Sequence, residues 1–186
     1  MSLSAAAGVA RLARFRADGL AAFDASPVGL LNALAPWFAF ALVGGGLAFA
    51  GGAPRSAAVE VLGSLVALLA PPVLSQGLAQ LWGRASAWLR YAVAATWCQW
   101  MMPPALLGAV LASGLLIALG VPQKVAEALA GLAAVAYALA LHLFVARRGL
   151  ALSLWRAGVV VVAVDLGTAA LAWGPLLLAA GWETGR

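Results

Sequence analysis

Charged side chains are scarce in this sequence. Of its 186 residues, 9% are Asp, Glu, Lys or Arg, whereas 65% are hydrophobic. About a quarter of the residues in a soluble domain are charged, so this chain cannot cover a water-facing surface. Lipid must therefore be the solvent for most of it. The length suits one bundle of four to six helices, since a membrane span needs about 20 apolar residues.

Cysteine and histidine are almost absent. Cys98 is the only cysteine, which excludes a disulfide within the chain and argues against a cysteine zinc site. In an apolar helix its thiol is expected to be unreactive. His142 is the only histidine, and it stands outside every spacing that is typical of a catalytic or metal motif. The sequence therefore predicts no catalytic residue, no metal and no cofactor.

The apolar residues form five long stretches. Strands are excluded because these stretches lack period-two alternation and are far longer than a barrel strand. The predicted fold class is all-α, an integral membrane bundle of about five transmembrane helices over residues 28–180, with a short tail at 181–186. The predicted spans are residues 28–50, 57–80, 91–119, 125–146 and 157–180.

Residues 1–27 are predicted to be a cytoplasmic or interfacial amphipathic segment that precedes the first span. A helix over residues 4–24 would lie on the surface at the lipid headgroups, and a disordered cytoplasmic tail is the alternative. "DASP" (24–27) then supplies a helix cap and a proline. The apolar residues that share one side of the helical wheel are Val9, Leu12, Leu20 and Phe23.

The basic residues are scattered between the spans rather than gathered on one face, which argues against nucleic acid as a partner. Their distribution follows the positive-inside rule. This distribution predicts that the N-terminus is cytoplasmic and the C-terminus periplasmic. The richness in Ala, Gly, Leu and Arg is typical of a GC-rich bacterial genome, so the predicted location is a bacterial inner membrane. Eight basic residues fall on the predicted cytoplasmic side (Arg11, Arg14, Arg16, Arg84, Arg90, Arg147, Arg148, Arg156) and three on the other (Arg55, Lys124, Arg186).

Four polar side chains are candidates for a site within the membrane. Asp165 is the acidic residue that lies well inside a span, where a charge costs about 2.5–3.5 kcal/mol on insertion scales. Two interpretations stay open: a proton or cation relay, or an aspartate that locks helix packing through neighbours such as Thr168. Gln76, Gln99 and His142 complete the set.

Two proline pairs stand at similar depth in consecutive spans. Pro71–Pro72 lies in the second span and Pro103–Pro104 in the third. Each pair is expected to break or kink its helix, because proline removes a donor and clashes with the preceding turn. The freed carbonyls need donors, and Gln76 and Gln99 lie within about one turn of the pairs. Facing broken helices form sites in some transporters, and simple kinks are the alternative.

The stretch "WCQWMMPP" (97–104) is predicted to be the cytoplasmic half of the third span, ended by a built-in break. Trp97 and Trp100 share one helix face and Gln99 points away from them, toward the interior. Met102 precedes a proline and is expected to leave helical geometry. A helix over residues 86–102 that lies along the membrane surface is the alternative.

One family resemblance runs through the middle of the chain. A glycine-containing loop, a small residue and "YA" precede a proline, and the next span ends near an aromatic residue. The residues concerned are Gly83, Ser86, Tyr91–Ala92, Pro103 and Tyr137. This order resembles that of Yip1-domain membrane proteins. The resemblance implies a five-span fold over about residues 30–175 with a cytoplasmic N-terminus, and it implies no catalytic residue.

Three functions follow from these observations. The first is a non-enzymatic scaffold or accessory subunit of Yip1-like type, which packs against other membrane proteins or itself through small residues such as Gly108 and Ala112. The second is a small transporter or channel-like protein with a polar cavity around Asp165. The third, an intramembrane enzyme, needs two convergent catalytic groups, and His142 and Asp165 alone are available. In each case the lipid bilayer is the main partner.

Overall fold

The computed structural model describes residues 3–52 and 54–184. Within these ranges the chain is helical and contains no strand. The elements are α1 (Leu3–Leu12), η1 (Ala17–Ala22), α2 (Pro27–Ala50), α3 (Pro54–Leu81), α4 (Ala85–Cys98), η2 (Gln99–Met101), α5 (Met102–Ala118), α6 (Gln123–Gly149) and α7 (Leu154–Thr184), where η marks a 3-10 helix.

Within the described residues, five helical segments are long and apolar enough to cross a membrane. They are Pro27–Ala50, Ala57–Leu81, Ala85–Ala118, Gln123–Gly149 and Leu154–Gly174. The all-α fold and the five membrane-length helices are therefore confirmed, and the chain is a multi-pass membrane protein.

The helix ends differ from the predicted spans by a few residues. α6 and α7 begin before the apolar stretches do, since polar residues at the ends of a span can stay helical outside the hydrocarbon core. α7 continues to Thr184, so the predicted tail at 181–186 is helical over 181–184. Residues 185–186 lie outside the described residues.

The start of α2 follows the predicted cap. The side chain of Ser26 accepts a hydrogen bond from the Gly29 N–H at 3.0 Å, and Pro27 occupies the first turn, where its missing N–H costs no hydrogen bond.

The turn from α5 to α6 requires a glycine. Gly120 has a φ of 89°, which other residues rarely adopt.

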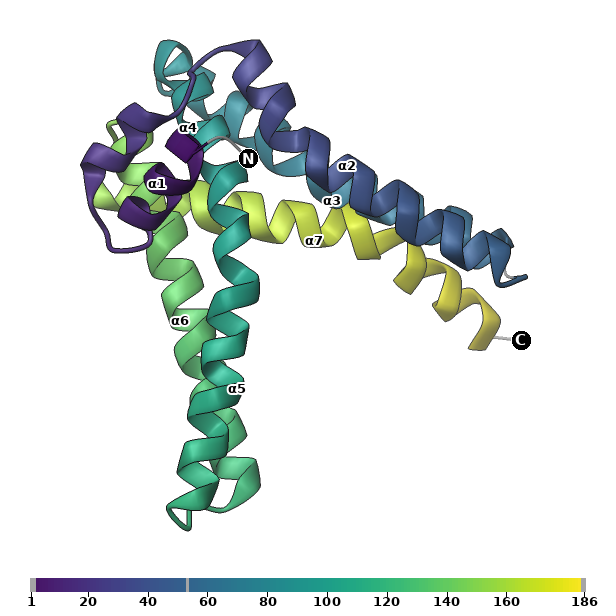
Figure 1. Cartoon of the computed structure of the whole chain (residues 1–186). Helices are drawn as coiled ribbons and strands as arrows, with labels where there is room; N and C mark the ends of the chain where they lie inside the picture. The colour runs from purple at the N-terminus through teal and green to yellow at the C-terminus, as the bar shows by residue number, and fades with distance from the viewer. Residues whose placement is uncertain (1–2, 53, 185–186) are drawn as a thin grey trace.

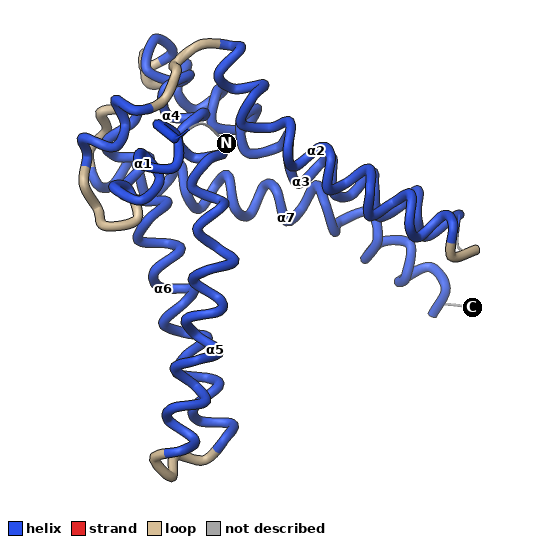
Figure 2. Tube along the Cα trace, viewed as in Figure 1, coloured by secondary structure: helices blue, strands red, loops and turns tan. Residues whose placement is uncertain are grey.

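Two groups of helices diverge from one end of the molecule (Figure 1, Figure 2). α3 packs against α2 and α7 to form a three-helix arm, and α5 packs against α6 to form a hairpin. The two groups meet in a region that we call the head. It comprises α1, η1, α4, the end of α6 (141–149) and the start of α7 (154–164).

The buried core lies in the head. Large side chains from four helices are fully buried there in one cluster, namely Leu12, Val93, Leu141, Val145 and Val160. By contrast, no residue of α5 is buried, and its leucines and valines are mostly exposed. The hairpin therefore presents apolar side chains outward, as a lipid-facing helix does.

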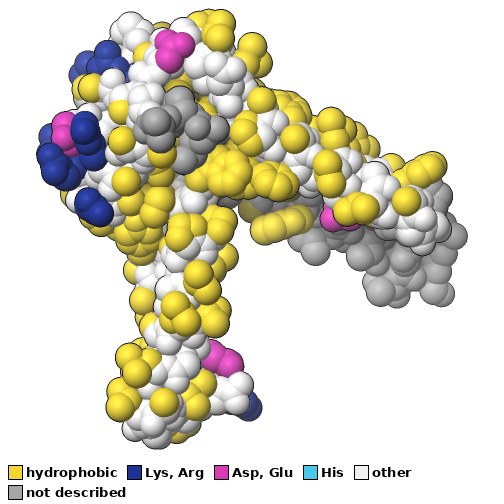
Figure 3. Space-filling view, viewed as in Figure 1, with side chains coloured by type: hydrophobic (Ala, Val, Ile, Leu, Met, Phe, Trp, Pro, Cys, Tyr) yellow, Lys and Arg dark blue, Asp and Glu magenta, His cyan; other side chains and the backbone are white. Residues whose placement is uncertain are grey.

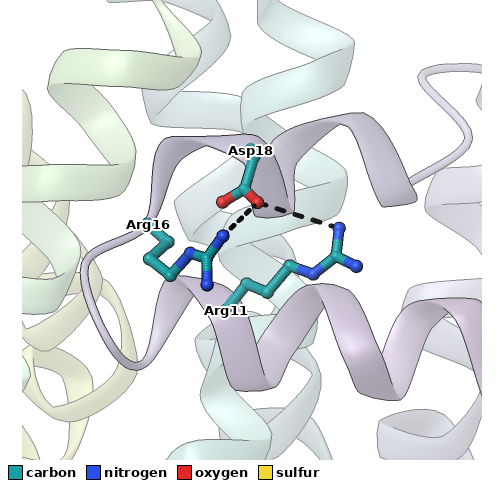
Figure 4. Close-up of polar contacts among 3 residues, drawn as sticks. All are labelled: Arg11, Arg16 and Asp18. Atoms are coloured by element: carbon teal, nitrogen blue, oxygen red, sulfur yellow. Dashed lines mark hydrogen bonds and ion pairs between the residues drawn. The ribbon is translucent and has the colours of Figure 1, made fainter.

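The N-terminal segment consists of two helical pieces rather than one. The chain reverses at Phe15, which adopts a left-handed conformation with a φ of 58°. Asp18 of η1 pairs with Arg16 at 3.0 Å and with Arg11 of α1 at 3.9 Å, and these exposed ion pairs link the two pieces (Figure 4).

The apolar side of this segment packs on protein. All four residues of the predicted apolar face are buried: Val9, Leu12, Leu20 and Phe23. Tyr137 of α6 also donates a hydrogen bond to the Ala13 carbonyl at 3.0 Å. A continuous amphipathic helix at the lipid headgroups is thus not confirmed, because the turn brings both halves of its apolar face against α4 and α6. An interfacial position for this segment stays a prediction.

Charge separates along the molecule. In Figure 3, Lys and Arg side chains gather on the head, and apolar side chains cover most of the hairpin up to its tip. The tip carries Lys124 and Glu127, both exposed. Basic side chains therefore gather on the head, and the apolar hairpin leads away from them to a charged tip.

The two proline pairs behave differently. α3 continues as one helix through Pro71–Pro72, so this pair does not break it. The Ser75 hydroxyl donates to the Pro72 carbonyl at 3.1 Å, which satisfies one backbone acceptor of this turn. The helix at Pro103–Pro104 is interrupted: α4 ends at Cys98, and η2 separates it from α5.

The interruption lies before the prolines, and Met102 keeps helical angles (φ −66°, ψ −48°), contrary to the prediction. Pro103 cannot donate to the carbonyl of Gln99, four residues earlier. The Met102 N–H bonds to that carbonyl instead, which is the tighter spacing of a 3-10 turn. The local change of helix type therefore falls on residues 99–101, and both prolines sit in the first turn of α5.

Candidate functional site

A cavity of about 880 Å³ lies among four helices. α3 packs against α4 and α7, and α6 packs against the same two helices, so the four form a ring. A volume of this size is within the range of small-molecule sites. Most of the lining is apolar, and its polar or ionisable side chains are Glu60, Ser64, Tyr91, Gln99, His142, Asp165 and Thr168.

The cavity is elongated along the three-helix arm. Its wall on α3 runs from Val59 to Pro71, and its wall on α7 runs from Val161 to Trp173. Each stretch rises about 18 Å at 1.5 Å per residue, which is more than half of a hydrocarbon core about 30 Å thick. The cavity therefore extends over much of the depth that a membrane would occupy.

His142 of α6 and Asp165 of α7 face each other in this cavity. The His142 Nδ1 lies 3.9 Å from the Asp165 Oδ1, which is too far for a hydrogen bond. Their side chains are 33% and 41% exposed, respectively. The carboxylate is therefore open to the cavity, and His142 is the basic side chain that lies within 4 Å of it among the described residues.

Thr168 is not the partner of Asp165 that the sequence suggested. Its Oγ1 is buried and has no hydrogen-bond partner among the described residues. Helix packing locked through an Asp165–Thr168 hydrogen bond is therefore wrong. Both residues line the cavity, but the Thr168 oxygen is itself buried, so the carboxylate of Asp165 is the acceptor that is open to the cavity.

Three of the four polar candidates meet at this site. Gln99, His142 and Asp165 come from η2, α6 and α7 and all line the cavity, whereas Gln76 of α3 does not. Gln99 thus faces the bundle interior, in a cavity that it shares with Pro71 and not with Gln76. The buried polar residue of this part of α3 is Ser75, which accepts a hydrogen bond from the Trp88 indole at 3.2 Å.

Pro71 also contributes to the wall. Because it has no N–H, the carbonyl of Ala67, four residues earlier, loses its usual donor within the helix. Ala67 and Pro71 both line the cavity. A proline that leaves α3 unbroken can therefore still provide a backbone acceptor next to the cavity.

Ser64, Glu60 and Tyr91 were missed as site residues. Glu60 is exposed, as a solvated residue would be, but it also lines one end of the cavity. A signal was present in α3: Glu60, Ser64, Ala67 and Pro71 follow one another at spacings of four, three and four, and so share a face. Tyr91 gave no such signal.

The two tryptophans of "WCQWMMPP" have different surroundings. Trp97 is buried in the head, beside the equally buried Cys98. Trp100 instead stacks on Trp37 of α2, with ring centroids 4.9 Å apart, and Phe40 lies 5.9 Å from it. Most of this stretch therefore serves packing, and Gln99 is its contribution to the cavity.

His142 and Asp165 converge, yet in the described part of the chain no hydroxyl or thiol hydrogen-bonds to the imidazole as an activated nucleophile would. Over the same residues there is no group of three or more His, Cys, Asp or Glu side chains that could hold a metal ion.

Comparisons with protein-family models, with curated proteins and with solved structures found no match. The resemblance to Yip1-domain proteins stays a prediction.

Proposed function

We propose that this chain is a non-enzymatic membrane protein that moves a small solute through the cavity, as a small transporter or channel-like protein does. One observation carries the proposal: Gln99, His142 and Asp165 converge on one cavity from elements far apart in the sequence. Ionisable residues inside spans are costly, and they commonly mark the pathways of solutes, ions or protons.

The proposed setting is a bacterial inner membrane with the N-terminus in the cytoplasm and the C-terminus in the periplasm. The gathering of basic side chains on the head supports this orientation (Figure 3). The end of the cavity near Tyr91 and Gln99 then faces the cytoplasm. The end near Glu60 and Trp173 faces the periplasm.

A second candidate is a scaffold or accessory subunit of Yip1-like type. It is favoured by the hairpin, because Gly108 and Ala112 of α5 are exposed and nothing lies within 4 Å of a Cβ built on Gly108. Small residues of this kind let another transmembrane helix approach closely. This candidate requires no water in the cavity.

Thiol accessibility distinguishes the two candidates. In a Cys98→Ser background, we expect Ser64→Cys and Thr168→Cys to react with a water-soluble, membrane-impermeant maleimide from both sides of the membrane, in right-side-out and in inverted vesicles. Both positions line the cavity, and an exchange pathway must wet them from each side in turn.

Three further single-cysteine variants serve as controls. Leu111→Cys on the exposed face of α5 should stay unreactive in lipid, Gln123→Cys should react from the periplasmic side alone, and Arg148→Cys from the cytoplasmic side alone. If the controls behave so and both cavity cysteines stay unreactive, solute movement is excluded and the scaffold role remains. Reversed controls would invert the proposed orientation.

A further inference from the structure

We propose that the cavity binds an organic cation with an apolar body, and that the Asp165 carboxylate is its counter-ion. The inference rests on the proposed function in one respect, since it places the solute in the same cavity. It adds the chemical class of the ligand, which the charge and the walls of the cavity define.

The charged side chains that line the cavity indicate that its ligand is positively charged. Asp165 and Glu60 bring two carboxylates, and none of the described residues around the cavity is Lys or Arg. His142 is the one basic group that could offset them, so even a protonated imidazole leaves an excess of negative charge. Charge pairs interact more strongly at a low effective dielectric constant than in water, so this cavity favours cations and repels anions.

The apolar walls exclude a bare metal ion as the preferred ligand. Hard cations take six or more oxygen ligands, whereas small and aliphatic side chains such as Gly63, Ala67 and Val164 make up most of this surface. Those walls fit hydrocarbon instead. Tyr91 and Trp173 add two aromatic rings to the lining, and such rings attract organic cations through their faces.

The wall formed by α3 is compatible with the same ligand class. Pro71 has no N–H to donate to the carbonyl of Ala67, four residues earlier, and both residues line the cavity. A protonated amine could donate an N–H bond to that carbonyl while its charge pairs with the carboxylate, which an anion or a hydrocarbon could not do.

A pair of ions with the same shape and opposite charge tests the inference directly. We expect the purified protein in detergent to bind tetraphenylphosphonium in equilibrium dialysis, after subtraction of protein-free micelles, and to bind tetraphenylborate at least about tenfold more weakly. This comparison uses the unaltered chain. Equal or tighter binding of tetraphenylborate would overturn the proposal.

Two variants then locate the site. Asp165→Asn keeps the shape and should weaken tetraphenylphosphonium binding by about tenfold or more. Glu127→Gln removes a carboxylate at the tip of the hairpin, far from the cavity lining, and should leave binding unchanged. Unchanged binding by Asp165→Asn, or an equal loss in both variants, would overturn the assignment of Asp165. If Asp165→Asn does not fold, Ser64→Trp, which fills the cavity from α3, must abolish binding.

The binding experiment and the thiol-accessibility experiment can fail independently of each other. Equilibrium binding in detergent requires the cavity and its charge, whereas movement across a membrane also requires access from both sides. Binding without two-sided thiol access would keep the cation site and exclude transport. Two-sided access without cation binding would keep a pathway and overturn the ligand class.

Discussion

Truncation of Leu141 to alanine is expected to lower the free energy of unfolding by about 2–5 kcal/mol. Leu141 is fully buried at the point where α6 meets the other helices of the head. The smaller side chain leaves a void that close-packed neighbours such as Val93 and Val145 cannot fill. The loss can be measured by denaturant unfolding of the purified protein in mixed micelles.

Leu111→Ala is the matched control. It removes the same atoms from a side chain of α5 that is 65% exposed, and in a bilayer that side chain faces lipid. Its effect should stay within about 0.5 kcal/mol, as for an exposed position. Equal losses at both positions would mean that the head is not the stabilising core of this fold.

Replacing Pro103 and Pro104 by alanine is expected to rotate α5 about its own axis relative to α4. The substitutions restore two backbone donors, so residues 99–101 can return from a 3-10 to an α-helical turn. A 3-10 turn advances 120° per residue and an α-helix 100°, so three residues change the facing direction of α5 by about 60°. A side chain about 5 Å from the helix axis then moves by about 5 Å.

Spin labels can report this rotation. Labels at Ser113 of α5 and Val43 of α2, in a Cys98→Ser background, should show a shift of several ångströms in their distance distribution when both prolines are replaced. Replacing Pro36 inside α2 is the control and should leave the distance unchanged, because α2 is already continuous through that residue. An unchanged distance in the double variant would mean that packing, not the prolines, sets the break.

The sequence predicted the elements better than their arrangement. Low charge and five apolar stretches are sufficient to predict five membrane-length helices. A chain in lipid must satisfy its own backbone hydrogen bonds, and a helix does so within a single stretch. The reversal at Phe15 was not predicted, since a helical wheel assumes a continuous helix. The packing of its two halves depends on contacts with α4 and α6 that are remote in sequence.

The site was predicted by residue type and not by position. Asp165 and His142 were singled out because ionisable side chains are costly inside a membrane span. The helical periodicity of the two spans could not show that these side chains face each other. Gln76 was named because it lies within about one turn of Pro71–Pro72, and it lies outside the cavity, whereas Ser64 and Tyr91 were missed. Which face of each helix turns toward the cavity is set by packing among α3, α4, α6 and α7, and no local pattern encodes that.

The approach of His142 to Asp165 tests the assembled cavity most directly, and the composition makes it measurable in a bilayer. His142 is the only histidine, so histidine labelled with ¹⁵N reports one site, and the aspartate carboxyls to be labelled with ¹³C are those of Asp18, Asp24 and Asp165. The 3.9 Å between Nδ1 and Oδ1 places the carboxyl carbon within about 5 Å of the nitrogen. Solid-state NMR dipolar recoupling in lipid should therefore dephase one aspartate carboxyl signal, and Asp165→Asn should abolish that dephasing. If no carboxyl signal dephases, His142 and Asp165 do not share a cavity and the proposed solute site does not exist.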